Sequence, residues 1–554
     1  MKSLTRRCMF CGFLAFILSG CTNNAHSERD EFMRIHTKYT INGRPVLGTY
    51  GGTSLEELRL VKEVGMNLVF GGGELLDTTS ERGRFCFENG IKVMYSLAGH
   101  VHGSPSLFDD ITAGQNEIRI HYGKPYPGPA LVQIDDEMIR YQSANDTTLL
   151  GCERGAHGTA AAPHHAGLIL VWPEKVEESV RQVMDSPNLF GYYVIDDSPG
   201  AAISALRGVY RVVKRVDPHN HPVCGGYSGG TTLHNFAADA ADVIMAYYYP
   251  FLKWEYDRTM TSYDTQWMLT AARKKSPGVE LFGIYQGFWG GQWNQQHPLS
   301  PEDIREQVED FVRDGASGII SFYIGSAPEQ NFYGWQVEEP LKREIQAINR
   351  EITQTGGLKI NPEPRFMADM RFQPKGYWEH PQDVPGIPPA WWVLAPFDDP
   401  EKKLLATSFP PEQGIDLNAS YQGKGRTIHW RKIETCAGGI GLVETIGPLS
   451  FLFHSVAYAT CEVTSPRDQN VQMRVGSGHD CIIWVDGLQV YRFDGLRGVH
   501  WDSNMVTMRL KEGKNRILVK VCDQEGQWGF FVRFTDRSGK PLEGLTFSPA
   551  QDAG

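Results

Sequence analysis

Short apolar runs alternate with longer amphipathic stretches between residues 46 and 349. The strands of a parallel sheet that is covered on both faces read as continuous apolar runs of this kind. There are eight of them, at residues 46–50, 66–70, 91–97, 190–195, 222–227, 243–249, 281–285 and 318–324. Because a closed parallel barrel needs eight strands, we predict an α/β fold with a (β/α)8 TIM barrel over residues 41–355.

Two helix starts stand out between these runs. Ser54 precedes Glu57 by three residues, which is the spacing of a capping box, and Ser300 stands before Pro301, which suits the first position of a helix. The competing architecture is an open doubly wound sheet. It is disfavoured because no Gly-x-Gly-x-x-Gly signature of a dinucleotide-binding loop follows the first run. The second run is followed by three consecutive glycines at 71–73, which do not form that signature.

The interval from residue 104 to 171 is too long for a βα loop and holds β-like segments of its own, at 116–122, 130–134, 137–141 and 148–152. The stretches at 134–141, 151–159 and 164–167 resemble a small β module found in phage tail proteins and in some secreted proteins. We predict an inserted β module after the third strand, with its glycines in turns and its carboxylates at the surface.

The composition changes after a helix that we expect near residues 340–354. Seven prolines between positions 362 and 389 mark a linker over residues 356–390. From 391 to 554 the pattern is one of short alternating segments separated by turns, at 457–463, 471–475, 481–485, 490–493, 506–510, 516–521 and 529–534. This pattern predicts an all-β sandwich or jelly roll.

Four stretches of this C-terminal region, at 476–480, 483–487, 510–520 and 528–533, carry a resemblance. They look like the galactose-binding-like jelly-roll modules that are appended to secreted carbohydrate-active enzymes. The resemblance implies a jelly-roll β-sandwich over residues 391–554 and a protein that works on carbohydrate.

The N-terminus is typical of a bacterial lipoprotein signal. Basic residues come first, an apolar run follows from Met9 to Leu18, and Leu18-Ser19-Gly20-Cys21 closes the segment. The run is shorter than the ~20 apolar residues of a membrane span. We therefore predict a signal peptide over 1–21, lipidation at Cys21, a flexible tether over 22–40, and a protein anchored to the inner or outer membrane that faces the periplasm or the exterior.

The composition narrows the choice of partners. The chain has 554 residues, of which 41% are hydrophobic, and a net charge of −11. Such a charge argues against nucleic acid as a partner. Beyond Cys21 seven cysteines remain, without a metal-binding spacing, and we expect most of them to be small buried residues.

The fourth predicted strand ends in Tyr192-Tyr-Val-Ile-Asp-Asp-Ser-Pro-Gly200. In a (β/α)8 barrel the active site lies at the C-terminal ends of the strands. This ending resembles that of clan A glycoside hydrolases, in which an Asn-Glu or Asp-Glu pair precedes a proline. The resemblance implies that Asp196 is the supporting residue and Asp197 the general acid. The structural alternative is that Asp197 caps the following turn.

A glycosidase of the common type needs a second carboxylate across the sugar. The family places it at the end of the seventh strand, where this chain has Gln286 and no acid. The other candidates are Glu74 and Asp77 after the second strand and Glu329 after the eighth. Each of these can equally be a solvated loop residue.

Aromatic residues are frequent at the same strand ends, and sugar rings stack their C–H faces on aromatic planes. Together with Gln286, the residues that we expect to contact a sugar are Tyr247, Tyr249, Trp289, Trp293 and Tyr323. Alternating tyrosines can also simply fill a barrel.

His100 and His102 end the third predicted strand, where alternation would point both imidazoles the same way toward a metal, with Glu74 or Asp77 as a third ligand. The spacing of a complete metal site is lacking, and neither a nucleophile elbow nor a phosphate loop is present. We predict no cofactor and no metal.

Two functions fit these features. The first is a lipoprotein with glycoside hydrolase-like activity on a polysaccharide or glycoside. The second is a carbohydrate-binding lipoprotein whose barrel has lost its chemistry, since the strand-seven carboxylate is missing.

Overall fold

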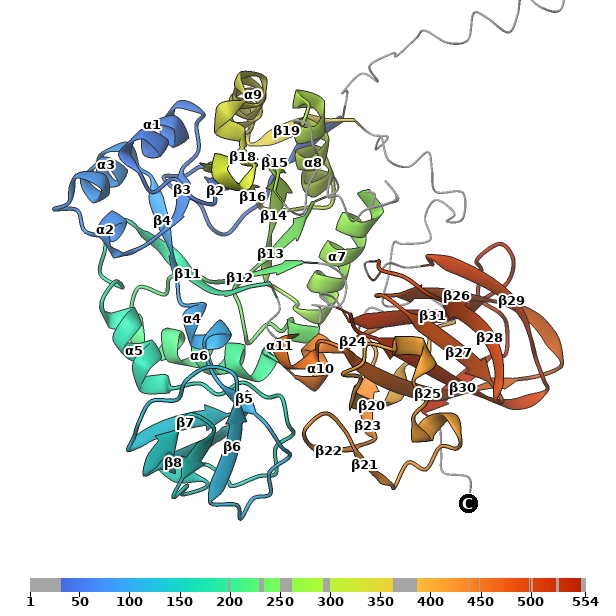
Figure 1. The fold of residues 1–554 in the computed structure, drawn as a ribbon. Helices are drawn as coiled ribbons and strands as arrows, with labels where there is room; N and C mark the ends of the chain where they lie inside the picture. Colours follow the sequence, from blue (N-terminus) through green and yellow to red (C-terminus); the bar gives the residue numbers. More distant parts are fainter. Residues whose placement is uncertain are drawn as a thin grey trace, which may run out of the picture.

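The computed structural model describes residues 31–549 except 198–199, 229–233, 250–261, 292–298, 362–385, 437, 448, 498, 500–501 and 525–527. Eight parallel strands close into a barrel (Figure 1). In barrel order they are β2 (Val46–Thr49), β3 (Leu68–Gly71), β4 (Lys92–Ser96), β11 (Leu189–Asp196), β12 (Val223–Ser228), β13 (Val243–Tyr248), β14 (Glu280–Gln286) and β16 (Gly318–Phe322). Each coincides with one predicted apolar run, so the predicted barrel is confirmed.

Helices flank the barrel strands, and the longer ones cover the outside of the barrel (Figure 1). They are α1 (Leu55–Glu63), α2 (Gly73–Leu76), α3 (Glu81–Asn89), α4 (Gly99–His102), α5 (Pro173–Arg181), α6 (Ile203–Val216), α7 (Ser262–Lys275), α8 (Pro301–Arg313) and α9 (Glu339–Thr355). Both predicted starts are confirmed. Ser54 caps α1 in a capping box with Glu57, and Ser300 caps α8 with Pro301 at its first turn.

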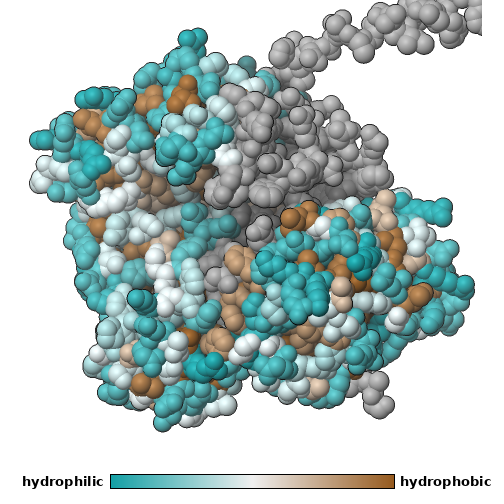
Figure 2. Space-filling view, in the orientation of Figure 1, coloured by the Kyte–Doolittle hydropathy of each residue, from teal (hydrophilic) through white to brown (hydrophobic). Residues whose placement is uncertain are grey.

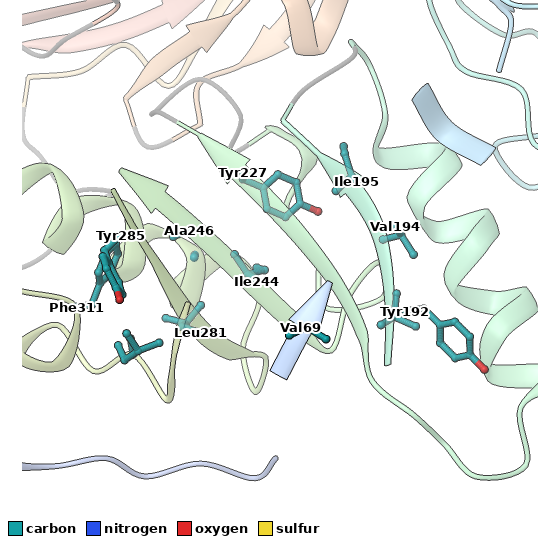
Figure 3. Close-up of a cluster of buried hydrophobic side chains, with 14 of the residues drawn as sticks. Val69, Tyr192, Val194, Ile195, Tyr227, Ile244, Ala246, Leu281, Tyr285 and Phe311 are labelled. Atoms are coloured by element: carbon teal, nitrogen blue, oxygen red, sulfur yellow. The ribbon is translucent and has the colours of Figure 1, made fainter. Parts of the chain in front are cut away.

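The strands bury both of their faces, which explains their continuous apolar sequences. Strand residues that point outward pack against the helices, among them Tyr192 and Val194 of β11 and Ile244 and Ala246 of β13. Phe311 of α8 belongs to the same cluster (Figure 3). Residues that point inward fill the barrel, among them Val46, Leu68, Met94, Tyr193 and Phe282. The barrel interior is thus a packed core of side chains.

The segment after β4 forms the predicted β insertion. One sheet has the order β5 (Ser106–Leu107), β6 (Glu117–His121), β10 (Thr148–Leu150), β9 (Ser143–Asn145), and β7 (Ala130–Ile134) pairs with β8 (Glu137–Tyr141). The prediction that its carboxylates lie at the surface is wrong for Glu137, which is 1% exposed. Arg154 and His164 surround this carboxylate with donors at 2.8 Å, because a charge removed from water must be paired.

The C-terminal part consists of antiparallel sheets. One contains β20 (Ala390–Asp398), β23 (Arg431–Glu434), β25 (Ser455–Ser465), β27 (Cys481–Val485), β28 (Leu488–Phe493), β30 (Gly513–Cys522) and β32 (Thr546–Pro549). The other has the order β24 (Gly439–Gly441), β31 (Gly529–Thr535), β26 (Gln469–Ser477), β29 (Asn504–Leu510). Their apolar faces share one core, so the predicted second, all-β unit is present.

Smaller strands complete the fold. They are β1 (Glu31–Arg34) with β19 (Gly357–Ile360), β21 (Ser420–Gln422) with β22 (Thr427–His429), and β15 (Phe288–Gly290), β18 (Phe332–Gly334) and β17 (Ser326–Ala327) in one small sheet. Residues 31–34, which we expected in a flexible tether, therefore form a paired strand. Most of the expected linker lies outside the described residues.

The C-terminal unit packs against the inserted module. Arg426 donates hydrogen bonds to the carbonyls of Phe108 and Ile446, both at 3.1 Å. Phe451 of the short helix α11 (Leu449–Leu452) lies edge-on to Phe108 and to His121 at 5.6 and 5.0 Å. An arginine that satisfies two buried carbonyls fixes the two units against each other.

The seven described cysteines are all buried and free, as expected for small apolar residues. Hydrophilic residues predominate on the outer helices and on the C-terminal sheets, and apolar residues show there as scattered patches (Figure 2). Within the described part of the chain, no helix has the length and apolar character of a membrane span.

Candidate active site

A pocket of about 610 Å³ opens at the C-terminal ends of four neighbouring barrel strands, β2, β3, β4 and β11. Its lining residues are Tyr50, Phe70, Gly71, Gly72, Met94, Tyr95, Ser96, Ala98, Gly99, His102, Tyr193 and Asp196. This is the end of a (β/α)8 barrel at which active sites are built, since the strands deliver their last side chains there. The volume lies within the range of small-molecule sites.

Three aromatic rings make up one wall of the pocket. Tyr50 stacks on Phe70 at 3.9 Å with an interplanar angle of 14°, and Tyr193 stands edge-on to both, at 5.9 and 5.2 Å. The three rings come from β11, β3 and the residue after β2, and their side chains point inward. Such a wall offers the flat apolar surface on which a sugar ring can stack.

The hydroxyls of the two tyrosines form a chain that ends on a carboxylate. Tyr193 donates to Oδ1 of Asp196 at 2.9 Å, and the hydroxyls of Tyr50 and Tyr193 are hydrogen-bonded to each other. Burial holds the pKa of both tyrosines well above the usual value, so both stay protonated. The Tyr193 hydroxyl has one proton and donates it in the hydrogen bond to Asp196, so Tyr50 is the donor in the hydrogen bond between the two tyrosines.

A register shift in β11 aims Asp196 at the pocket. The pairing of β11 with β12 slips between Tyr193 and Ile195, and both Val194 and Ile195 belong to the outer core. A bulge of this kind re-aims the next side chain, and Asp196 consequently lies in the pocket lining. The following residue, Asp197, adopts a left-handed φ of 63° and donates its backbone N–H to Gly226.

The surroundings of Asp196 favour its protonated form. Loss of hydration in the pocket raises the pKa of this carboxyl, and the negative charge of Asp197 raises it further, while the bond from Tyr193 opposes both effects. A carboxyl whose pKa is raised by an aromatic pocket keeps its proton to higher pH, which is what a general acid requires.

His102 supports the same strand end. Its Nε2 accepts the backbone N–H of Asp196 at 3.0 Å, which places the ring proton of the neutral imidazole on Nδ1. Burial lowers the pKa of His102, although Asp197 opposes this shift. The neutral ring thus acts as an acceptor that fixes the backbone of the acid.

The predicted alternation of His100 and His102 on a strand is wrong, because β4 ends at Ser96 and both residues lie in the helical turn α4. The turn separates their side chains, and His100 is hydrogen-bonded to Ser179 of α5 at 3.0 Å instead. Among the described residues no group of three or more histidine, cysteine or acidic side chains is arranged to hold a metal ion.

The two candidates after β3 are engaged in local structure. Glu74 forms an ion pair with Arg82. Asp77 accepts hydrogen bonds from the hydroxyl and the backbone N–H of Thr79, and these bonds lower its pKa. The pocket is lined by Gly71 and Gly72 of the same loop, not by these acids.

Gln286 is fully buried at the end of β14. Its side-chain amide donates to the carbonyl of Phe288 at 3.2 Å. The side chain of Gln307 accepts a hydrogen bond from the backbone N–H of Gln286 and donates one to its carbonyl. A side chain without solvent exposure does not reach a ligand in this arrangement. Glu329 is exposed in a short 3-10 turn after β17.

The aromatic residues expected to bind sugar lie over the other half of the barrel. Tyr247 stacks on Tyr249 at 5.4 Å and an interplanar angle of 22°, and both are half-buried. Trp289 stacks on Tyr333 at 4.4 Å, and Tyr323 packs beside Phe322 at 5.5 Å. None of the four predicted aromatics lines the pocket described above. Trp293 lies outside the described residues.

Most of the residues that line the pocket are not among the site residues predicted from the sequence. Tyr50, Phe70 and Tyr193 were counted only as parts of apolar runs. Their positions at the ends of the first, second and fourth strands were the available signal, since neighbouring barrel strands bring their ends to one mouth.

No model of a known protein family matches this chain, and no curated protein matches it. Among solved structures, a β-galactosidase from the psychrophilic Marinomonas ef1 is similar at 10% identity and a TM-score of 0.35, over 55% of this chain and 59% of that chain. A GH2 β-galacturonidase from Eisenbergiella tayi bound to glycerol matches at 13% identity and a TM-score of 0.33, over 58% and 53%.

The PA14 sugar-binding domain from an RTX adhesin matches a shorter part of the chain, at 16% identity and a TM-score of 0.15, over 17% of this chain and 52% of that domain. The chain thus spans little more than half the length of each of these structures.

Proposed function

We propose that this protein binds carbohydrate in the pocket at the mouth of its barrel and hydrolyses glycosides there, with Asp196 as the proton donor. The observation that carries the proposal is the Asp196 carboxyl, which lies in an aromatic-lined pocket with a raised pKa. Glycoside cleavage needs such an acid, because the leaving oxygen must be protonated as the bond breaks.

The proposal reverses the roles that the family resemblance implies for the acidic pair. Asp196 lies in the pocket lining, whereas Asp197 follows it with a left-handed backbone. Burial raises the pKa of Asp196, and the negative charge of Asp197 raises it further. Asp197, which is not among the lining residues, acts on the acid through its charge.

A second candidate function is carbohydrate binding without turnover. It is favoured by one observation: among the described lining residues Asp196 is the only carboxylate, and the strand-seven position holds the enclosed amide of Gln286. A barrel of this kind binds a sugar on its aromatic wall but lacks the common catalytic pair.

A glycan panel separates the two functions. Purified wild type and Asp196→Asn are compared for binding and for release of reducing ends. Hydrolysis by the wild type, with binding but about 100-fold or more slower turnover by Asp196→Asn, supports the hydrolase. Binding without turnover by both proteins supports the second function, and absence of both properties contradicts the carbohydrate proposal.

We also propose that the protein is exported and anchored through a lipid on Cys21. The support is the order of basic residues, apolar run and Leu-Ser-Gly-Cys at the N-terminus. Residues 1–30 lie outside the described part of the chain. Such an anchor would present the barrel to polysaccharides outside the cytoplasm.

A further inference from the structure

The pocket at the barrel mouth has an inner and an outer level. The three rings of its aromatic wall belong to the cluster of side chains that fills the barrel or pack against it, and they form the inner level. The outer level consists of lining residues that follow the strand ends, because Gly72 comes after β3 and Ala98 and Gly99 come after β4. Asp196 is the last residue of β11 and therefore marks the boundary between the two levels.

The fold does not require every glycine of the pocket lining. At Gly71 a Cβ would lie 2.3 Å from Cδ1 of Leu75, which occupies the space that a side chain would need. At Gly72 and Gly99 a Cβ would meet no atom within 4 Å, and neither residue has the left-handed φ that favours glycine. Side chains at these two positions would therefore take up part of the pocket that the residues line.

Gly99 lies on the side of the pocket that holds the acid. It begins α4, and His102 follows one helical turn later on the same face of that helix. Nε2 of His102 accepts the backbone N–H of Asp196 at 3.0 Å. The outer level therefore lies beside the group that protonates the leaving oxygen, where a sugar attached through that oxygen must fit.

Packed rings close the inner level toward the other half of the barrel. Phe322 packs against Tyr50 at 5.0 Å. Tyr249 and Phe288 in turn pack against Phe322, at 5.6 and 5.5 Å. The inner level thus receives the terminal unit of a glycan. Positive charge develops on the sugar ring whose C1 reacts, and aromatic faces stabilise such a charge, so the unit at the aromatic wall is the one whose bond is cleaved.

From this arrangement we infer that the substrates are oligosaccharides or polysaccharides cleaved at the non-reducing end, and that Gly72 and Gly99 determine specificity by leaving room for the second sugar. The inference rests on the proposed hydrolase function and names its substrate class. The C1–O bond of the terminal sugar breaks, and Asp196 gives its proton to the linking oxygen of the second sugar. Water supplies the hydroxyl at C1 and the proton that restores the acid. The volume of about 610 Å³ suits two sugar units, since pockets in this range enclose drug-sized ligands.

The test places leucine, a good helix former, at Gly72 and at Gly99. The matched control is Gly73→Leu, in the same glycine triplet. A Cβ at Gly73 also meets no atom within 4 Å, but this residue is not among the pocket lining. All three variants add the same side chain to an exposed glycine, and only two of them add it to the pocket.

For a sugar that the wild type cleaves, kcat/KM is measured on the trisaccharide and on the glycosyl fluoride, whose leaving group is a single atom. The ratio of the two values should fall by about 10-fold or more in Gly72→Leu and in Gly99→Leu, and it should stay within about twofold in Gly73→Leu. A folding defect lowers both rates and leaves the ratio unchanged, so the ratio reports specificity alone.

Two further measurements use the same proteins. With a hexasaccharide labelled at its reducing end, the first labelled product should be the pentasaccharide. In calorimetry, the two pocket variants should lose the preference of the wild type for the trisaccharide over the monosaccharide, and Gly73→Leu should keep it.

The inference is overturned if the ratio is unchanged in both pocket variants, if it falls equally in Gly73→Leu, or if the hexasaccharide is cut internally. The proposed function fails in a different way. Binding without turnover on the glycan panel contradicts the hydrolase and the cleavage from the chain end, whereas calorimetry still decides the role of the two glycines. Absence of both turnover and binding overturns the proposed function and this inference together.

Discussion

The Tyr193 hydroxyl donates a hydrogen bond to Oδ1 of Asp196 over 2.9 Å. This bond stabilises the ionised carboxylate and so opposes the two effects that raise its pKa, burial and the charge of Asp197. The pKa of Asp196 therefore reflects two effects that raise it and one hydrogen bond that lowers it. A substitution at Tyr193 changes this pKa without changing the carboxyl itself.

Tyr193→Phe should move the alkaline limb of the pH–activity profile to higher pH. The donor acid is active while protonated, so activity falls as the pH rises through its pKa. Removal of a bond that lowers this pKa raises it further, and the acid stays protonated longer. The profile of kcat/KM against pH measures the shift. Tyr227→Phe, which changes a buried tyrosine of the outer core on β12, is the control and should leave the limb in place.

Gly226→Ala should disturb the same hydroxyl from the neighbouring strand. A Cβ at position 226 would lie 1.8 Å from Oη of Tyr193, so the ring must leave the position from which it donates to Asp196. We expect the alkaline limb to shift as in Tyr193→Phe, with about 1–3 kcal/mol of lost stability from overpacking. Gly114→Ala meets no atom within 4 Å and should behave as wild type in both measurements. An unshifted limb in Gly226→Ala would argue against the role of Tyr193.

Arg154→Ala should destabilise the inserted module strongly. The guanidinium donates two hydrogen bonds to the buried Glu137 carboxylate, and its loss leaves this charge with only His164 and two backbone N–H groups as donors. Removal of one partner of a buried pair costs about 3–5 kcal/mol. Hydrogen exchange of the backbone amides of β7 and β8 measures the local opening free energy. Glu153→Ala, which breaks an exposed pair with Arg140, should cost less than about 1 kcal/mol.

His164 should make the stability of the module depend on pH. Burial lowers the pKa of His164, but the hydrogen bonds to Asp135 and Glu137 outweigh it and raise the pKa above 6.5. Burial raises the pKa of Glu137, but the donors Arg154, Ala162 and His164 lower it to about 2 from a usual 4.5. The stability that protonated His164 contributes to the module is therefore fully present below pH 6.5 and is lost as the pH rises through the pKa of His164 in the folded state. The Glu137 contribution is complete above 4.5 and is lost as the pH falls.

The two contributions overlap between pH 4.5 and 6.5. His164→Asn should lose most stability relative to wild type in this window, and the difference should shrink at alkaline pH. Hydrogen exchange of the module as a function of pH is the measurement. A difference that grows at alkaline pH would contradict the protonated state assigned to His164.

The barrel could be predicted because its strands are buried on both faces, so that every run from Val46 to Phe322 is apolar irrespective of what it packs against. Helix starts at Ser54 and Ser300 were equally readable, since a cap depends only on residues three positions apart.

The pocket could not be predicted in the same way. Tyr50 and Tyr193 are separated by 143 residues and meet only because β2 and β11 deliver their ends to one mouth. The bulge that turns Asp196 inward leaves no signal in the apolar pattern. For Gln286 the sequence indicated a ligand contact that the structure does not show. Its position at a strand end suggested the contact, but Phe288 and Gln307 enclose the residue.

Cys21→Ser should release the protein from the membrane fraction. A lipid on the cysteine sulfur provides the anchor in our proposal, and serine cannot carry it. Detergent phase partitioning of cells that express each form measures the change, and Cys86→Ser, at a buried cysteine of the barrel, is the control. Membrane association that survives Cys21→Ser would contradict the anchor.

The most direct test of the proposed function is the rate at which wild type and Asp196→Asn release sugar from aryl and natural glycosides, measured beside ligand binding by calorimetry. The proposal predicts turnover by the wild type, a loss of about 100-fold or more in Asp196→Asn on natural glycosides, and a smaller loss on aryl glycosides, whose leaving groups need less protonation. Equal turnover by the two proteins, or sugar binding with no turnover by the wild type, would contradict it.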